Sequence, residues 1–153
     1  MKVIVQRSKK SNVKVDDKIT GEIDKGLVVL VGFTQDDTEK EIEYITNKII
    51  NLRVFDDENN IMNKNIKEIN GSILLVSQFT LYADTQKGNR PSYSKALSSK
   101  EAIKLYEIFI NKLKENNIKV ETGLFGHHME LNITNDGPVT IIIEKNNETN
   151  CAK

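Results

Sequence analysis

Closely spaced short strands in the first 33 residues constrain the fold of this 153-residue chain more than any other feature. Apolar or alternating segments follow one another with only a few turn-forming residues between them. Such spacing permits hairpins but leaves no room for the crossovers that parallel neighbours need. The segments are Lys2–Arg7, Asn12–Val15, Ile19–Ile23 and Leu27–Phe33. We therefore expect the chain to begin as an antiparallel sheet.

Two capping boxes predict the main helices. Thr38–Glu41 carries Thr and Glu at the reciprocal positions, and isoleucines at helical spacing follow, so a helix is expected over residues 38–51. Ser98–Glu101 repeats this pattern before an apolar face that continues to about Asn117.

The remaining apolar segments complete the predicted sheet. We expect an α+β fold with a mainly antiparallel, barrel-like β core and two main helices packed on it. Residues 1–144 form one predicted domain, and residues 145–153 a flexible polar tail. The further expected strands are Leu52–Phe55, a central strand Ser72–Gln78 extended by Phe79–Tyr82, Lys119–Thr122, Met129–Asn135 and Val139–Glu144, with loops at Asp56–Gly71 and Ala83–Ser94 and a turn at Gly123–Gly126.

Charge and hydropathy exclude two classes of protein. The 22 basic and 22 acidic residues give a net charge of zero, which argues against gripping nucleic acid by bulk charge, so a polyanion would need a local site. No apolar run is long enough to span a bilayer, and we expect a cytoplasmic protein without membrane contact. The single cysteine, Cys151, cannot form an intrachain disulfide and lies in the predicted tail.

No cofactor or metal is predicted. The chain has no CxxC, and its two histidines, His127 and His128, are adjacent, so on a strand they would face opposite sides. The glycines form neither GxGxxG nor GxxxxGK[ST], and there is no GxSxG elbow. A catalytic triad would have to use one of these histidines, so an enzyme here needs another mechanism.

Two segments break local rules, and each has two interpretations. In Ser77–Leu81, polar residues interrupt an apolar strand, which indicates either a strand leaving the core or the floor of a pocket. Thr80 would be a nucleophile only with a base, and no basic residue is near it in sequence. Asn135–Thr140 is rich in turn residues, yet a glycine before a proline also lets a ligand approach the main chain closely.

Together these segments resemble the paired motifs of the D-aminoacyl-tRNA deacylase family. The motifs read Ser77-Gln78-Phe79-Thr80-Leu81 and Asn135-Asp136-Gly137-Pro138-Val139-Thr140, and their order and spacing make coincidence hard to sustain. The resemblance covers nearly the whole chain. It extends to Val5-Gln6-Arg7, Gly21-Glu22-Ile23, Arg53-Val54-Phe55, Met62-Asn63, Ala83-Asp84-Thr85, Gly88-Asn89-Arg90-Pro91-Ser92 and Thr122-Gly123-Leu124-Phe125-Gly126 leading to Met129.

The resemblance implies a hydrolase that acts in chiral proofreading, a form of translation quality control. Such proteins are cytoplasmic homodimers that bind the 3′ end of aminoacyl-tRNA and cleave the ester joining a D-amino acid or glycine to the terminal adenosine. Gly137-Pro138 would be a Gly-cis-Pro element that enters the partner's active site and excludes L-amino acids, with Arg7 and Asn135 as supporting residues.

The resemblance also assigns the catalytic and adenosine-binding residues. Catalysis would use Ser77, Gln78, Phe79 and Thr80 around the ester, with help from the tRNA 2′-hydroxyl and no side-chain nucleophile. The terminal adenosine would lie against three residues whose other interpretation is core packing: Phe125, Gly126 and Met129.

Further features of the sequence bear on the function. His127 departs from the family, whose members commonly carry a small residue there, which puts the detailed shape of the adenosine pocket in doubt. Lys87, Arg90 and Lys95 either meet tRNA phosphates or form a solvated loop. The rival functions are a non-enzymatic DNA- or RNA-binding dimer and a structural dimer whose site has decayed.

Overall fold

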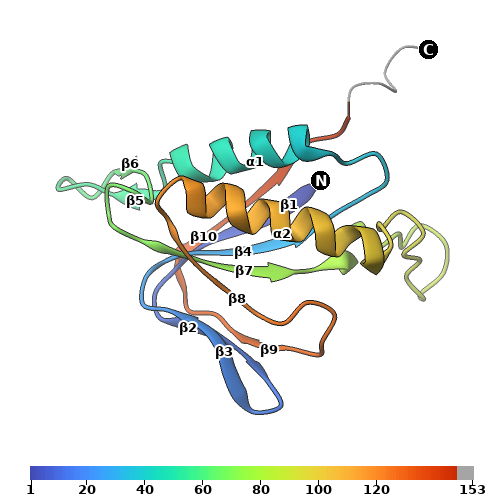
Figure 1. Ribbon diagram of the computed structural model, residues 1–153. Helices are drawn as coiled ribbons and strands as arrows, with labels where there is room; N and C mark the ends of the chain where they lie inside the picture. Colours follow the sequence, from blue (N-terminus) through green and yellow to red (C-terminus); the bar gives the residue numbers. More distant parts are fainter. Residues whose placement is uncertain (148–153) are drawn as a thin grey trace.

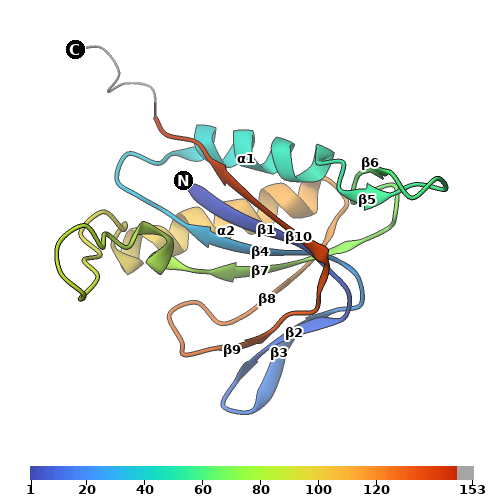
Figure 2. The same cartoon turned by 180° about the vertical axis from the view of Figure 1, so that it is seen from behind.

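Two helices, two packed sheets and a small two-stranded hairpin make up the described part of the protein (Figures 1 and 2). The computed structural model describes residues 1–147. Helices α1 and α2 lie side by side on one face of a five-stranded sheet, and a three-stranded sheet packs below the other face (Figure 1). The elements are β1 (Lys2–Ser8), β2 (Ser11–Val15), β3 (Lys18–Ile23), β4 (Gly26–Gly32), α1 (Glu39–Asn51), β5 (Phe55–Asp56), β6 (Met62–Lys64), β7 (Ser72–Ser77), the 3₁₀ helix η1 (Phe79–Tyr82), α2 (Ser99–Glu115), β8 (Lys119–Thr122), β9 (Glu130–Asn132) and β10 (Asn135–Glu144).

The strand pairing follows from the connections. The five-stranded sheet has the order β10-β1-β4-β7-β8, and the three-stranded sheet the order β3-β2-β9. Hairpin-connected neighbours are antiparallel, as expected, whereas β4, β7 and β8 are parallel because α1 and α2 serve as their crossovers. The α+β class with two packed helices is confirmed. The strands within residues 1–147 form two open sheets and one small hairpin, and no closed barrel.

The main core lies between the helices and the five-stranded sheet. Ile45 and Ile49 of α1 and Phe109 and Leu113 of α2 are fully buried there. The predicted capping box of α1 is present, with Thr38 as the N-cap. At α2 the reciprocal box is incomplete, since the Ser98 hydroxyl donates to the Glu101 carboxylate (2.7 Å) instead of capping a backbone amide.

A second, smaller core joins the two sheets. Val13 and Ile23 of the three-stranded sheet pack on Val28, Leu74 and Val76 of β4 and β7. This contact covers only the β4 and β7 part of that face. The part formed by β1 and β10 is otherwise uncovered: the Tyr82 ring of η1 reaches its Lys2 end, and Ile142 on this part is 66% exposed.

Local departures from the predicted elements concentrate where strands end. Phe79–Tyr82 forms a 3₁₀ turn and does not extend the strand. The expected strand Leu52–Phe55 is reduced to β5, which starts at Phe55, and its partner β6 lies within the expected loop at Asp56–Gly71. β7 is an interior strand of the sheet but not its centre, which is β4.

The start of the predicted tail makes defined contacts. The backbones of Met1 and Lys145 exchange hydrogen bonds (2.9 Å each way), and the Asn147 side chain donates to the Asp36 carbonyl (3.1 Å). The rest of the tail, including Cys151, lies outside the described residues. None of the described helices combines the length and apolar character required to cross a membrane.

Candidate active site

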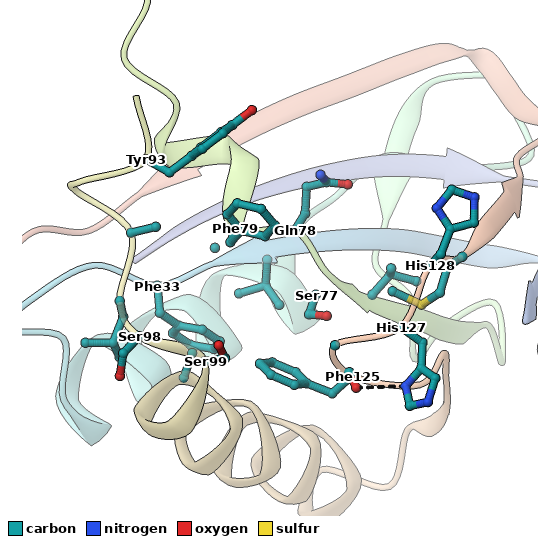
Figure 3. A pocket seen from close by; sticks show the side chains of 18 of the residues that line it. Phe33, Ser77, Gln78, Phe79, Tyr93, Ser98, Ser99, Phe125, His127 and His128 are labelled. Carbon is teal, nitrogen blue, oxygen red and sulfur yellow. Dashed lines mark hydrogen bonds between the residues drawn. The ribbon is translucent and has the colours of Figure 1, made fainter. Parts of the chain in front are cut away.

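A cavity of about 580 Å³ opens where β4 and β7 end (Figure 3). Its walls come from the end of β4, the end of β7 with the start of η1, the loop before α2 with the first turn of that helix, and the β8–β9 loop with Leu131 of β9. The size is within the range typical of small-molecule and cofactor sites.

The first motif lies in the wall of this cavity. Ser77, Gln78 and Phe79 line it, as the pocket-floor interpretation predicts, while Thr80 is not among its lining residues. The Gln78 amide donates to the Val31 carbonyl (2.6 Å), which keeps the chain attached to β4 as it leaves the sheet. The Gln78 side chain donates to the Thr80 hydroxyl. The polar residues are thus both the end of a strand and part of a pocket.

The predicted adenosine-binding residues line the same cavity. Phe125, Gly126 and Met129 come from the β8–β9 loop. Gly126 has a φ of +77°, a conformation that favours glycine, and its turn is closed by a hydrogen bond from the His127 amide to the Leu124 carbonyl (3.2 Å).

Phe125 both packs against the core and lines the cavity. Its ring packs on the buried Tyr106 of α2, with the ring centroids 5.4 Å apart, while its other side faces the cavity (Figure 3). The hydroxyl of Tyr106 donates to the Leu75 carbonyl (2.8 Å), and burial raises the pKa of this phenol. The cavity wall is therefore anchored to the core.

Further lining residues come from the β8–β9 loop and from the segment that leads into α2. His127 and His128 both reach the cavity, and the Nδ1 of His127 lies 3.1 Å from the Phe125 carbonyl. Tyr93 contributes an aromatic ring from the long loop before α2, and Ser98 and Ser99 contribute hydroxyls from the start of α2. The histidines adjoin the predicted adenosine-binding residues in sequence, whereas only the chain fold brings Tyr93, Ser98 and Ser99 to the cavity, so no local signal could have found these three.

The titratable side chains of the lining are few. They are Tyr93, His127 and His128, and no carboxylate within residues 1–147 lines the cavity. The other polar groups of the lining include the hydroxyls of Ser77, Ser98 and Ser99 and the carboxamide of Gln78.

The second motif lies within a strand and not in a hairpin turn. Asn135–Glu144 is continuous as β10, with Gly137 and Pro138 exposed and joined by a cis peptide bond. Gly137 has a φ of +127°. The pairing with β1 shifts register at this point, so the backbone bulges away from the sheet.

Arg7 and Asn135 brace this bulge. The side-chain Nε of Arg7 donates to the Asp136 carbonyl (2.9 Å), and a terminal nitrogen donates to the Val54 carbonyl (2.9 Å). The Asn135 side chain accepts from the Val139 amide (3.0 Å) and donates to the Thr140 hydroxyl (2.9 Å). The Arg7 side chain is buried (9% exposed), whereas the hydrogen bonds of Asn135 lie nearer the surface.

The two motifs lie far apart in space within the folded chain. β10 pairs with β1 at Gln6 and Ser8, whereas the cavity residue Gly32 pairs with Lys2 at the other end of β1. Strand spacings put Pro138 about 15–20 Å from the cavity. The structure therefore brings the predicted catalytic and adenosine-binding residues together and leaves the Gly137-Pro138 element outside that group.

Comparison with known proteins gives a consistent result. Residues 4–144 match the family model described as D-Tyr-tRNA(Tyr) deacylase. Curated proteins named D-aminoacyl-tRNA deacylase are similar over nearly the whole chain. Those of Thermosipho melanesiensis and Thermosipho africanus are 54% and 51% identical, each over 94% of this chain and 97% of its own length, and that of Flavobacterium psychrophilum is 50% identical over 97% and 99%.

Two solved structures share the fold. A structure named c-Myc DNA Unwinding Element Binding Protein has a TM-score of 0.90 and 38% identity, covering 96% of this chain and all of that one. A probable eukaryotic D-amino acid tRNA deacylase has a TM-score of 0.78 at 17% identity, covering 93% of this chain and 97% of that one, and shows the fold alone.

These matches define an ester hydrolase acting in proofreading, so the expected class of enzyme is confirmed. The chain belongs to the D-Tyr-tRNA(Tyr) deacylase family.

Proposed function

We propose that this protein is a homodimer that hydrolyses the ester between a D-amino acid, or glycine, and the 3′-terminal adenosine of tRNA. The observation that carries the proposal is the single cavity shared by Ser77, Gln78 and Phe79 on one side and Phe125, Gly126 and Met129 on the other. Both predicted subsites thus meet in one pocket. Since aminoacyl-tRNA is made and used in the cytoplasm, the enzyme works there.

The chemistry uses backbone and substrate groups. The Phe79 amide opens the η1 turn, where the first N–H groups have no carbonyl acceptor within the turn, and it donates to the oxyanion that develops at the ester carbonyl. The 2′-hydroxyl of the terminal adenosine assists the attacking water. Ser77 and Gln78 orient the ester, and Thr80 positions Gln78 through their hydrogen bond. No side chain of the protein forms a covalent intermediate.

The Gly137-Pro138 element acts on the partner's cavity. Its distance from its own cavity supports this arrangement, because no local movement of a braced bulge covers about 15–20 Å. It lies at one end of the uncovered face of β1 and β10, while the cavity opens near the other end. A two-fold axis across these strands puts each element over the partner's cavity, as an isologous interface requires.

The uncovered face has the composition of such an interface. Ile4 of β1 lies opposite Ile142 of β10, and the neighbouring pair Gln6 and Thr140 is joined by a side-chain hydrogen bond (3.2 Å). Ile142, at 66% exposure, is the most exposed large hydrophobic side chain of the described residues. Burying this side chain in a dimer interface is favourable because it removes apolar surface from water.

Backbone atoms of the inserted element provide the chiral filter. An L side chain would point at the element and collide with it, whereas a D side chain points outward and meets no wall. A steric clash with fixed main-chain atoms discriminates against the L-aminoacyl ester more strongly than favourable contacts could discriminate in favour of the D-aminoacyl ester. The filter therefore depends on the configuration at Cα and little on the identity of the amino acid.

Release of amino acid from matched D- and L-tyrosyl-tRNA tests this function. The purified protein, assayed with a chelator present, is expected to hydrolyse the D ester rapidly and the L ester no faster than buffer. Sedimentation on the same sample reports the dimer. A folded dimer that cleaves neither ester would overturn the proposal, and equal cleavage of both would overturn the chiral filter.

A second candidate is a DNA-binding module, and one specific observation favours it. The relative named as a DNA-unwinding-element binding protein is 38% identical over nearly the whole chain. The zero net charge of this chain argues against it, because bulk DNA binding normally needs a basic surface. Salt-dependent binding to duplex or single-stranded DNA without ester hydrolysis would support this candidate.

A further inference from the structure

Two partly exposed aromatic rings lie at the edge of the cavity. Phe79 is 57% exposed and Tyr93 is 40% exposed, although both line the pocket. Their ring centroids are 5.1 Å apart and their planes are inclined at 68°, an edge-to-face contact. Tyr93 therefore braces Phe79, and each ring keeps an open surface (Figure 3).

Hydrogen bonds of the backbone hold Tyr93 in place. Asp84 and Ser92 exchange amide-to-carbonyl hydrogen bonds of 2.8 and 2.9 Å, which close the loop just before Tyr93. The Tyr93 carbonyl accepts from the Ala96 amide (3.0 Å), and Lys95 pairs with the Asp84 carboxylate (3.0 Å). A large aromatic side chain on a tied loop is presented in advance, so little conformational entropy is lost when a flat ligand covers it.

From their position, these two rings are expected to contact a part of the substrate other than the terminal adenosine. Phe79 and Tyr93 lie on the opposite side of the cavity from Phe125 (Figure 3). If the adenine lies against Phe125 and Met129, as proposed above, the rings meet either the preceding nucleotide or the amino-acid side chain.

The charges on the same loop favour the nucleotide. Lys87 and Arg90 are exposed and take part in no ion pair within residues 1–147. Cations on a loop that also presents an aromatic ring suit a base with its phosphate, and they disfavour the protonated amino group of an aminoacyl ester.

We propose that Tyr93, supported by Phe79, stacks with the base of the nucleotide preceding the terminal adenosine, with Lys87 and Arg90 facing its phosphate. This inference rests on the proposed deacylase function and goes beyond it, since the enzyme then reads two nucleotides of the single-stranded 3′ end and not one. Stacking suits any base, because every base has a flat face.

Two substrates with the same amino acid test the inference. Kinetics are measured with D-tyrosyl-adenosine and with the dinucleotide ester D-tyrosyl-CpA. Wild-type protein is expected to have the higher kcat/KM for the dinucleotide, mainly through KM. Tyr93→Ala is expected to lower the dinucleotide-to-mononucleotide ratio by about fivefold to 150-fold, the range of base–aromatic stacking. Tyr93→Phe keeps the ring and restores the ratio.

Tyr44→Ala is the matched control. Tyr44 has the same 40% exposure but lies on α1, away from the cavity, so its loss leaves the ratio unchanged. Equal efficiency of both esters in the wild type, or an unchanged ratio in Tyr93→Ala, would overturn the inference alone. So would an equal loss on both esters that disappears when D-alanine replaces D-tyrosine, since the ring would then contact the amino acid. Hydrolysis of neither ester by the wild type would instead overturn the deacylase function.

Discussion

The two motif segments stand at different ends of the five-stranded sheet and are held in different ways. Ser77–Thr80 ends a buried strand, and its position comes from the sheet and from a cavity built around it. Gly137-Pro138 interrupts the edge strand β10, is exposed, and is held by the side chains of Arg7 from β1 and of Asn135 from β10 itself. The first segment lines the cavity of its own chain, whereas the second is not among the residues that line it.

This difference indicates where mutations should separate the two roles. Substitutions at the cavity should change the rate of hydrolysis and leave the preference for the D ester over the L ester unchanged. Damage at the brace should change selection, and loss of Arg7 should also cost stability, because this side chain is buried and charged. Each prediction below tests one side of this division.

Arg7→Ala is expected to have the largest effect. Arg7 is the buried donor to the carbonyls of Asp136 and Val54 and pairs with the Asp56 carboxylate (3.2 Å), so its loss leaves several acceptors without a partner. We expect the free energy of unfolding to fall by about 3 kcal/mol and D-tyrosyl-tRNA hydrolysis to fall at least tenfold. Urea unfolding and steady-state kinetics measure the two effects.

Arg53→Ala provides the control for this change. Its guanidinium also donates to a carbonyl, that of Asn63 (2.8 Å), but it is exposed, so the loss should be below about 0.5 kcal/mol. Equal losses in the two variants would show that Arg7 is an ordinary surface arginine and that the Gly137-Pro138 element needs no brace.

Gly137→Ala is expected to have the next largest effect, and it bears on selection. A Cβ at this position would lie 2.8 Å from Val139 Cγ2 and 3.0 Å from a guanidinium nitrogen of Arg7, and the φ of +127° is unfavourable for alanine. The element must shift, so the ratio of D- to L-tyrosyl-tRNA hydrolysis should fall at least tenfold, or activity on the D ester should be lost.

Gly88→Ala is the control that separates backbone strain at a positive φ from the steric clash of an added Cβ. Gly88 also has a positive φ, +71°, but nothing lies within 4 Å of an added Cβ. We expect this variant to keep the wild-type D-to-L ratio. An unaltered ratio in Gly137→Ala at full D activity would contradict a filter made by this segment.

The sequence was most informative where local rules decide the structure. The capping box at Thr38 and the isoleucine spacing predicted α1 because both are properties of one helix. The 3₁₀ turn at Phe79–Tyr82 was missed, since alternating polar and apolar residues fit a strand equally well and only the end of β7 at the cavity decides between them. The parallel pairing of β4 with β7 was missed because pairing partners are set by how the helices pack.

The candidate site divides in the same way. Residues within the two motifs could be named from the sequence, and Phe125 and Met129 could be added from the resemblance. Tyr93 and the hydroxyls of Ser98 and Ser99 could not, because they reach the cavity through a long loop and a helix start that only the tertiary structure brings near β7.

Thr80→Ala tests the cavity side with a smaller expected effect. Thr80 does not line the cavity, and its hydroxyl accepts from the Gln78 side chain. Its loss should free that side chain and lower kcat by less than about tenfold, with the D-to-L ratio preserved. A loss of about 10³-fold or more, the scale seen when a nucleophile is removed, would mean that Thr80 attacks the ester after all.

Tyr106→Phe is expected to have the smallest effect and tests whether the cavity wall depends on the core beneath it. The Tyr106 hydroxyl donates to the Leu75 carbonyl (2.8 Å), and its ring packs on Phe125, which faces the cavity. Phenylalanine keeps the ring contact and removes only the hydrogen bond, so thermal unfolding should report a loss of about 1 kcal/mol with kcat and the D-to-L ratio unchanged. An increase in KM at unchanged stability would instead mean that this hydrogen bond orients Phe125, so that the adenosine wall is set by α2 and not by its own loop.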